Sequence, residues 1–280
     1  MNRQLLAPYG LKWNPFAPEI PVEALLATPR IESFSVRVEH LVREGGFAAV
    51  LGPCGTGKSV ALRLLQKRLS GQRDVVVGAL TRPQCSVPDL YRELGHLFSA
   101  PLTPHNRWAC SKVLRERWQA HVESALFRPV LLIDEAQELK SAAVSELRLL
   151  MSKDLDSCAL LTIVLAGDER LKERLGEPDM LPVRSRLRVR LGLEESSRDE
   201  MLACLRHSLS AAGNVKLMTD ELMAALVDHA SGNLRALMTS ADELLHAGLE
   251  RDACALDEKL FFAVFQVPQA APKRAAGTRR

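Results

Sequence analysis

The stretch Gly52-Pro53-Cys54-Gly55-Thr56-Gly57-Lys58-Ser59 decides the fold of this chain. It fits the pattern Gly-x-x-x-x-Gly-Lys-Ser/Thr at every fixed position, and this pattern is typical of a phosphate-binding loop. The apolar run 47–51 before it predicts a buried strand, and residues 60–69 after it predict a helix. Strand, loop and helix in this order are the setting that the pattern requires. A glycine turn that merely joins a strand to a helix is the disfavoured alternative.

Each residue type in the loop has a physical reason to be there. Glycine at positions 52, 55 and 57 lets the backbone take positive φ and bring its N–H groups against phosphates, and a helix beginning near Lys58 adds its positive dipole end. Lys58 supplies a charge that reaches the β- and γ-phosphates, and the Ser59 hydroxyl is placed to ligate Mg²⁺. Cys54 fills a variable position, where a small tolerated side chain is the simpler interpretation. The residues that we predict to hold the nucleotide phosphates are Gly52, Pro53, Cys54, Gly55, Thr56, Gly57, Lys58 and Ser59.

The composition predicts a globular, intracellular protein. With 280 residues and 47% hydrophobic content, the chain can bury the core of one nucleotide-binding domain and a smaller appendage. No apolar run approaches the roughly 18 to 20 residues that a membrane span needs, and the N-terminus lacks the apolar middle of a signal peptide. The six cysteines form no C-x-x-C pair, so neither a zinc site nor a disulfide framework is indicated. We therefore expect a cytoplasmic protein with no membrane partner.

Basic residues are concentrated at the C-terminus. The net charge is +3, and the last eight residues contain Lys273, Arg274, Arg279 and Arg280 without any acid. The rest of the chain is close to neutral. This tail is most simply a disordered, solvated end, and contact with nucleic-acid phosphates is the alternative.

A second motif follows later in the chain. The run Pro129-Val130-Leu131-Leu132-Ile133 ends in Asp134 and Glu135. A buried parallel strand would carry Asp134 to the edge of the sheet where Ser59 lies, to hold Mg²⁺ directly or through water. Glu135 would then lie near the γ-phosphate and polarise the attacking water as a general base. Taken alone, such a run is often only a strand followed by a helix N-cap. The phosphate-binding loop upstream makes the interpretation as a metal and catalytic site more specific.

Two further segments carry chemical candidates. The run 160–167 predicts another strand, and Asp168 after it either senses the γ-phosphate or caps a helix over 169–175. The segment 184–190 alternates arginine with small or apolar residues, and strand periodicity would place its four guanidinium groups on one face. The alternatives for this segment are a solvated edge strand, an arginine finger toward a neighbouring subunit's nucleotide, and a stripe for DNA phosphates.

The two ends of the chain differ from its middle. Residues 1–30 predict an irregular arm rich in proline, in which Pro15 and Phe16 either line an adenine pocket or pack in a core. From Ser197 onward the pattern is helical, with a further helix start at Thr219. A later helix starts at Gly232-Asn233-Leu234-Arg235, and the side chain of Arg235, one turn into it, either folds back onto the phosphates or is exposed.

These elements predict an α/β fold with four parts. A parallel central sheet flanked by helices occupies residues 31–193 and follows the arm of residues 1–30. A small C-terminal helical lid occupies 194–267, and a basic, disordered tail covers 268–280. We also expect a helix over 137–151.

Together these motifs resemble the AAA+ ATPases. Loop 52–59, the Asp134-Glu135 strand end, the strand end at Gly167, the segment Arg184 to Arg186 and Gly232-x-x-Arg235 are similar, in order, to the Walker A, Walker B, sensor 1, arginine-finger and sensor 2 elements of that superfamily. Asn14-Pro15-Phe16 and Asp134-Glu135-Ala136-Gln137-Glu138 make the chain similar to the ExeA/TniB group. That group includes secretion-pathway ATPases and transposition-helper ATPases of the IstB, TniB, TnsC and MuB type.

The resemblance implies an ATP- and Mg²⁺-dependent homo-oligomer, a ring or a helical filament, that assembles on double-stranded DNA and assists a transposase in target capture. In this interpretation Asp134 and Ser59 hold the metal, Glu135 activates water, and Arg186 is the preferred arginine finger, with Arg184 second. Asp168 stands where the family has a neutral polar residue, so its role departs from the pattern. Secretion members carry a transmembrane segment and a peptidoglycan-binding domain that this sequence lacks, so we expect a transposition helper. A secretion or assembly ATPase acting on protein partners is the alternative.

Overall fold

The computed structural model describes residues 7–124, 127–153 and 158–265, and its contacts divide the chain into two units. The first unit consists of residues 21–197 together with 233–235, and the second of residues 1–20, 198–232 and 236–280. The predicted disordered tail, 268–280, lies outside the described residues.

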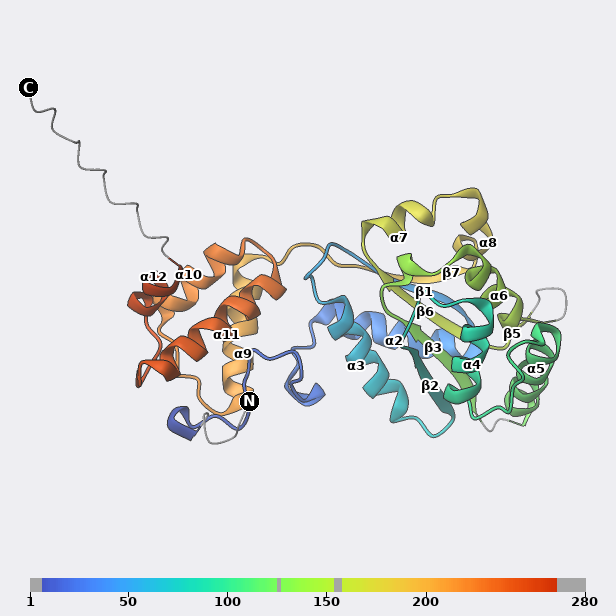
Figure 1. The fold of residues 1–280 in the computed structure, drawn as a ribbon, viewed down its shortest axis with the longest axis horizontal. Helices are drawn as coiled ribbons and strands as arrows, with labels where there is room; N and C mark the ends of the chain where they lie inside the picture. The colour runs from blue at the N-terminus through green and yellow to red at the C-terminus, as the bar shows by residue number, and fades with distance from the viewer. Residues whose placement is uncertain (1–6, 125–126, 154–157, 266–280) are drawn as a thin grey trace, which may run out of the picture. The chain divides into compact units, whose positions relative to one another are not determined.

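The first unit is built on a sheet of five parallel strands in the order β2-β3-β6-β1-β7 (Figure 1). The parallel sheet predicted from the sequence is confirmed. Because all five strands run in one direction, their carboxyl ends share one edge of the sheet, where ligands of such folds bind. The strands are β1 (Gly46–Leu51), β2 (Val75–Leu80), β3 (Arg128–Ile133), β6 (Thr162–Gly167) and β7 (Leu187–Gly192).

Helices cover both faces of this sheet, which explains why its central strands are continuous apolar runs. Side chains alternate along each strand: Leu131 and Ile133 of β3 enter one core, and Val130 and Leu132 enter the other. The first core is closed by α4 (Val87–Leu97), α5 (Arg107–Glu123) and α6 (Ser141–Met151), and the second by α2 (Pro29–Glu44) and α3 (Lys58–Ser70) (Figure 1). The smaller elements of this unit are η2 (Val22–Ala24), η3 (Ala136–Glu138), β4 (Ser152–Lys153), β5 (Cys158–Ala159), α7 (Glu169–Arg174), η4 (Pro178–Met180) and α8 (Leu181–Arg184).

The arginine-rich segment is not one strand, and that expectation was wrong. Arg184 ends the short helix α8, and Arg186 lies in the turn before β7, which begins at Leu187. Pro182 near the start of α8 favours a helical turn there, because its φ is already fixed near the helical value. Only Arg188 and Arg190 alternate with buried residues on the edge strand β7, so two guanidinium groups, rather than four, share a face.

The predicted helix over 137–151 is also divided. Residues 136–138 form the 3₁₀ turn η3, and α6 begins only at Ser141. Leu139 lies between them with an extended backbone (φ −62°, ψ 133°) and is 2% exposed. Burial of this leucine fixes a bend that a helical pattern alone does not predict.

The second unit is helical. It contains α9 (Arg198–Ala212), α10 (Asp220–Ala230), most of α11 (Leu234–Glu250) and α12 (Glu258–Phe265), with η1 (Ala7–Tyr9) at its N-terminal end. The predicted helix start at Thr219 is confirmed, because its Oγ1 accepts a hydrogen bond from the Leu222 N–H at 3.2 Å.

The N-terminal arm belongs to this helical unit. The Lys12 N–H donates to the Ala212 carbonyl at 2.9 Å, Asn14 Nδ2 donates to Asp242 Oδ1 at 2.5 Å, and Phe16 is 3% exposed. Of the two alternatives for this segment, the structure shows core burial of Phe16.

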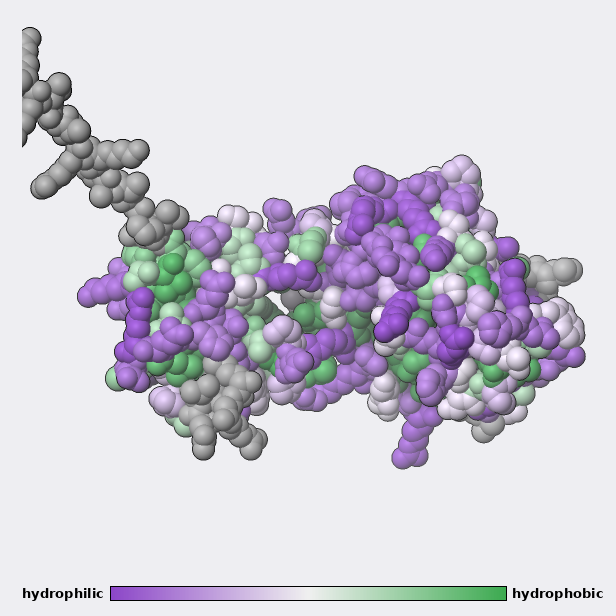
Figure 2. Space-filling model, in the orientation of Figure 1, coloured by the Kyte–Doolittle hydropathy of each residue, from purple (hydrophilic) through white to green (hydrophobic). Residues whose placement is uncertain are grey.

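Figure 2 shows hydrophilic residues over most of the visible face of each unit, with hydrophobic residues in small groups. Within residues 7–124, 127–153 and 158–265, no helix combines the length and the apolar character needed to cross a membrane.

Candidate nucleotide-binding and hydrolysis site

The loop between β1 and α3 has the backbone conformation of a phosphate cradle. Gly55 (φ +85°) and Gly57 (φ +95°) take left-handed conformations that side-chain-bearing residues rarely adopt. Gly52 does not take positive φ, which corrects our expectation for it. A Cβ there would lie 2.3 Å from the Leu193 carbonyl oxygen, so residue 52 is glycine because the chain at 193 passes directly over it.

Lys58 points into the loop. Its side chain is 7% exposed, and Nζ donates hydrogen bonds to the carbonyl oxygens of Gly52 at 2.9 Å and Pro53 at 2.8 Å. Thr56 Oγ1 donates to the same Pro53 carbonyl at 2.9 Å. An ammonium group has three N–H donors, so one remains for a phosphate oxygen beside the two that these carbonyls accept.

The two predicted metal ligands lie side by side, although they come from different elements. Ser59 Oγ, at the start of α3, donates to Asp134 Oδ2 at 2.6 Å, directly after β3. Asp134 Oδ1 accepts the Glu135 N–H at 2.9 Å. Among the described residues no cluster of three or more His, Cys, Asp or Glu side chains is present to hold a metal. One hydroxyl and one carboxylate fit Mg²⁺, which is usually bound by one or two carboxylates together with substrate phosphates and water.

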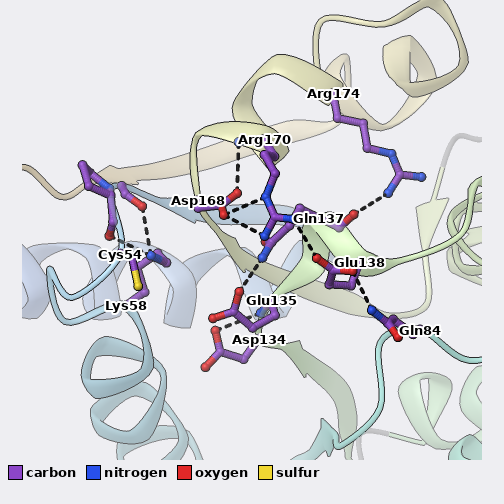
Figure 3. A network of polar contacts seen from close by, with 12 residues as sticks. Cys54, Lys58, Gln84, Asp134, Glu135, Gln137, Glu138, Asp168, Arg170 and Arg174 are labelled. Carbon is purple, nitrogen blue, oxygen red and sulfur yellow. Dashed lines mark hydrogen bonds and ion pairs between the residues drawn. The ribbon is translucent and has the colours of Figure 1, made fainter. Parts of the chain in front are cut away.

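Glu135 is exposed and takes a left-handed backbone conformation (φ +50°) at the end of β3. Its carboxylate oxygen Oε2 accepts a hydrogen bond from Gln137 Nε2 (Figure 3). No role was expected for Gln137. Its position two residues after the candidate base was the sequence signal that could have pointed to it. That spacing brings the Gln137 amide to the Glu135 carboxylate because residues 136–138 form the turn η3.

Asp168 caps a helix. Its Oδ1 accepts the Arg170 N–H at 3.0 Å, and its Oδ2 accepts Arg170 Nε at 2.9 Å (Figure 3). Partial burial acts to raise the pKa of Asp168, but the hydrogen bonds from Arg170 and the charges of Arg170 and Lys58 outweigh it, and the pKa is lowered. The cap is therefore the alternative that the structure shows, while contact with a γ-phosphate stays a prediction.

Residues 233–235 lie against the phosphate-binding loop. The Arg235 N–H donates to the Gly55 carbonyl at 3.3 Å, and Arg235 Nη1 lies 3.2 Å from Cys54 Sγ. Asn233 Nδ2 donates to the Cys54 carbonyl at 3.2 Å. Cys54 is therefore a contact of the arginine, and Asn233 is a loop contact that sequence reasoning missed.

The two candidate arginine fingers lie in a different segment of this unit. Arg184 is exposed at the end of α8, and Arg186 Nη1 donates to the Pro182 carbonyl. The structure thus brings together loop 52–59, Asp134, Glu135, Asp168 and Arg235, and it places Arg184 and Arg186 on the segment that leads into the edge strand β7.

Comparison with known proteins shows what this chain is similar to. Residues 42–175 match the family described as AAA domain. General secretion pathway protein A of Aeromonas hydrophila is 27% identical over 248 residues, a match that covers 87% of this chain and 44% of that protein. The chain thus spans less than half the length of this relative.

Two solved structures share the fold. The ORC2 protein of Aeropyrum pernix in its ADPNP-ADP complexes superposes with a TM-score of 0.69 at 14% identity, covering 88% of this chain and 69% of that one. Drosophila ORC bound to DNA superposes with a TM-score of 0.60 at 16% identity, covering 92% of this chain and 64% of that one. At such identities the likeness concerns the fold alone.

Proposed function

We propose that this chain, whose residues 42–175 match the AAA domain family, is an ATPase that binds ATP with Mg²⁺ at loop 52–59 and hydrolyses it with Glu135 as general base. We further propose that the ATP-bound chain forms a homo-oligomer on double-stranded DNA and assists a transposase in choosing its target.

The hydrolysis proposal rests on one observation: the Ser59 hydroxyl and the Asp134 carboxylate are hydrogen-bonded to each other next to Lys58. Gly55, Gly57 and the start of α3 present backbone N–H groups to phosphates, and Lys58 adds a charge. When bound, Mg²⁺ would be held by Ser59 and Asp134 and would supply charge neutralisation at the phosphates. Glu135 takes the proton of the attacking water, and Arg235, already against the loop, binds the phosphates from the other side.

Arginine 186, with Arg184 as second choice, would reach the nucleotide of a neighbouring copy. Both precede an edge strand, β7, and Arg184 is exposed. An arginine supplied in trans raises the rate of phosphoryl transfer by stabilising transition-state charge. A mixture of E135Q and R186A proteins tests this, because each supplies what the other lacks and hydrolysis recovers only if sites are shared between subunits.

The DNA proposal rests on basic residues of α2 and β7. Arg30 and Arg37 lie seven positions apart on one side of α2, and with Arg190 of β7 they line a groove of about 370 Å³. Among the residues that the structure describes, no acidic side chain lines that groove. Guanidinium groups without an acidic neighbour are suited to phosphate contacts. The ORC relative bound to DNA shares this fold, which agrees with the proposal.

A second candidate function is secretion or assembly work on protein partners. It is favoured by the match to General secretion pathway protein A, which extends over 87% of this chain. In that case DNA would change neither the hydrolysis rate nor the size of the oligomer.

The deciding experiment measures ATP hydrolysis and particle size with and without double-stranded DNA over a salt series. Faster turnover with DNA, and DNA-bound particles that dissociate as salt rises, support the transposition helper.

R37Q/R190Q should weaken DNA binding and flatten its salt dependence, while the control R82Q, which changes an exposed arginine away from the groove, should not. K58A should lose nucleotide binding or turnover, and E135Q should keep ATP bound and trap the oligomer. If DNA does not change the rate of ATP hydrolysis, the function on protein partners is favoured instead. If K58A hydrolyses ATP at an unaltered rate, the assigned site is wrong.

A further inference from the structure

The candidate base Glu135 is exposed, yet one amide restrains it. Gln137 Nε2 donates to Glu135 Oε2, and both residues lie on the short segment that follows β3 (Figure 3). An ionised carboxylate only accepts hydrogen bonds, so the amide must present its nitrogen to Glu135. This contact occupies Oε2 and leaves Oε1 to take a proton.

The other end of the same amide is held by packing. Gln137 Oε1 is buried and has no hydrogen-bond partner among the described residues. It lies against Gly167, where a Cβ would be 2.6 Å from Gln137 Oε1. A buried carbonyl without a partner costs free energy, so a site that keeps one calls for a reason other than stability. The absence of a side chain at residue 167 gives the amide its place at the end of β6.

The backbone of Gln137 is fixed from a neighbouring helix. Arg174 of α7 donates Nη1 to the Gln137 carbonyl at 3.1 Å and also to the Leu139 carbonyl. The next residue, Glu138, accepts Arg170 Nη1 at 3.0 Å and Gln84 Nε2 at 2.7 Å (Figure 3). The turn η3 is therefore held at two successive residues, and its side chains project from a fixed backbone.

We propose that Gln137 is the positioning residue of the hydrolysis reaction: it holds the carboxylate of Glu135 in the orientation in which Oε1 meets the attacking water. The proposal rests on the proposed role of Glu135 as base. A surface glutamate otherwise samples many rotamers, and misplacement of a catalytic group by about 1 Å can cost about 100-fold in rate. In this role Gln137 acts on the reaction only through Glu135, whose carboxylate its amide holds.

The test replaces Gln137 by methionine, which keeps the length of the side chain and removes the N–H donor. Q137M should lower kcat by about 10- to 100-fold and leave KM and ADP affinity unchanged. The matched control is Q119M on α5, where Gln119 Nε2 likewise donates to a glutamate, Glu123, at 2.9 Å. Q119M should hydrolyse ATP at the rate of the unaltered chain.

Two double-mutant cycles separate positioning from a general structural effect. In hydrolysis, E135Q/Q137M should be no slower than E135Q, because Gln137 has no base left to orient. In urea unfolding of the nucleotide-free protein, the shifts of the midpoint caused by changing Glu135 to Ala and by Q137M should be non-additive, since the two side chains share a hydrogen bond. Additive effects in both cycles would overturn the proposal.

The outcomes also distinguish the inference from the proposed function. If E135Q abolishes hydrolysis while Q137M hydrolyses normally, Glu135 is the base and Gln137 does not position it. If E135Q itself hydrolyses normally, the role of Glu135 fails first. A higher kcat for Q137M would likewise overturn the inference, because it would show that the amide restrains the base away from its working position.

Discussion

Replacement of Gly55 by alanine is the sharpest test of the loop geometry. Gly55 has φ +85°, and a Cβ built there would lie 2.1 Å from Asn233 Oδ1 and 2.7 Å from Asn233 Cγ. The substitution therefore acts in two ways: it strains the backbone, and it displaces the Asn233 side chain. That side chain donates to the Cys54 carbonyl at 3.2 Å and accepts the Arg235 N–H at 3.0 Å, so both hydrogen bonds are lost together.

The magnitude follows from these contacts. A left-handed conformation costs a non-glycine residue about 1–2 kcal/mol. Each hydrogen bond contributes about 1 kcal/mol, although the Asn233 amide is exposed and regains part of this from water. Alanine also reduces the entropy of the unfolded chain, which offsets about 0.4–1 kcal/mol. We expect G55A to lower the free energy of unfolding by about 2 kcal/mol.

Urea unfolding followed by far-UV circular dichroism measures this difference. The matched control is Gly192→Ala at the end of β7, where a Cβ has nothing within 4 Å and φ is outside the left-handed region. The control should change the free energy by less than about 0.5 kcal/mol. G55A should also bind ADP more weakly, because its loop N–H groups no longer converge. Equal urea midpoints for G55A and the control would refute the strain argument.

Three other predictions follow from side chains outside the loop. Arg107→Met should destabilise the protein by about 3 kcal/mol, measured by urea unfolding, because it leaves the Glu146 carboxylate, 2% exposed, without its cation. Glu39→Gln should cost about 1 kcal/mol at pH 7, since the hydrogen bond from Arg68 lowers the pKa of Glu39 from 4.5. This contribution is present above about pH 4.5 and is lost as pH falls through the lowered pKa, so the difference in unfolding free energy between the variant and the unaltered chain should shrink steadily as the pH falls below 4.5. Burial raises the pKa of the Cys204 thiol to about 11, so at pH 8 an alkylating reagent should modify Cys204 more slowly than the exposed Cys254.

The sequence was sufficient to predict the sheet and the edge where the site lies. The runs that became β1, β3 and β6 are short, apolar and buried on both faces, so their local pattern and their tertiary environment agree. The loop 52–59 between the first of these strands and α3 has glycines at the two positions with positive φ. Asp134 then reaches Ser59 because parallel strands end at one edge.

The errors arose where tertiary contacts override local pattern. The alternation of arginine with small or apolar residues predicted a strand from Arg184. The strand begins only at Leu187, because the residues around Pro182 form a helical turn. Gly52 was expected to need positive φ, and its actual constraint is the Leu193 carbonyl 2.3 Å from a Cβ, a neighbour distant in sequence. Gln137 was missed for the same reason, because its position depends on Gly167 and Arg174.

Asp168 is acidic where the resemblance predicts a neutral polar residue, and the contacts of α7 explain how an acid is accommodated there. An acidic residue at the end of β6, where a neutral polar residue was expected, would add a negative charge beside Lys58 and repel phosphates. Arg170 forms an ion pair with Asp168 at 2.9 Å and is shared with Glu138 at 3.0 Å. The Arg170 guanidinium therefore offsets part of the negative charge at the strand end, and together with Arg174 it ties α7 to the turn that carries Gln137 (Figure 3). The pair of Arg170 with Asp168 thus also helps to hold the turn from which Glu135 is restrained, so the ends of β3 and β6 are joined by one network of hydrogen bonds.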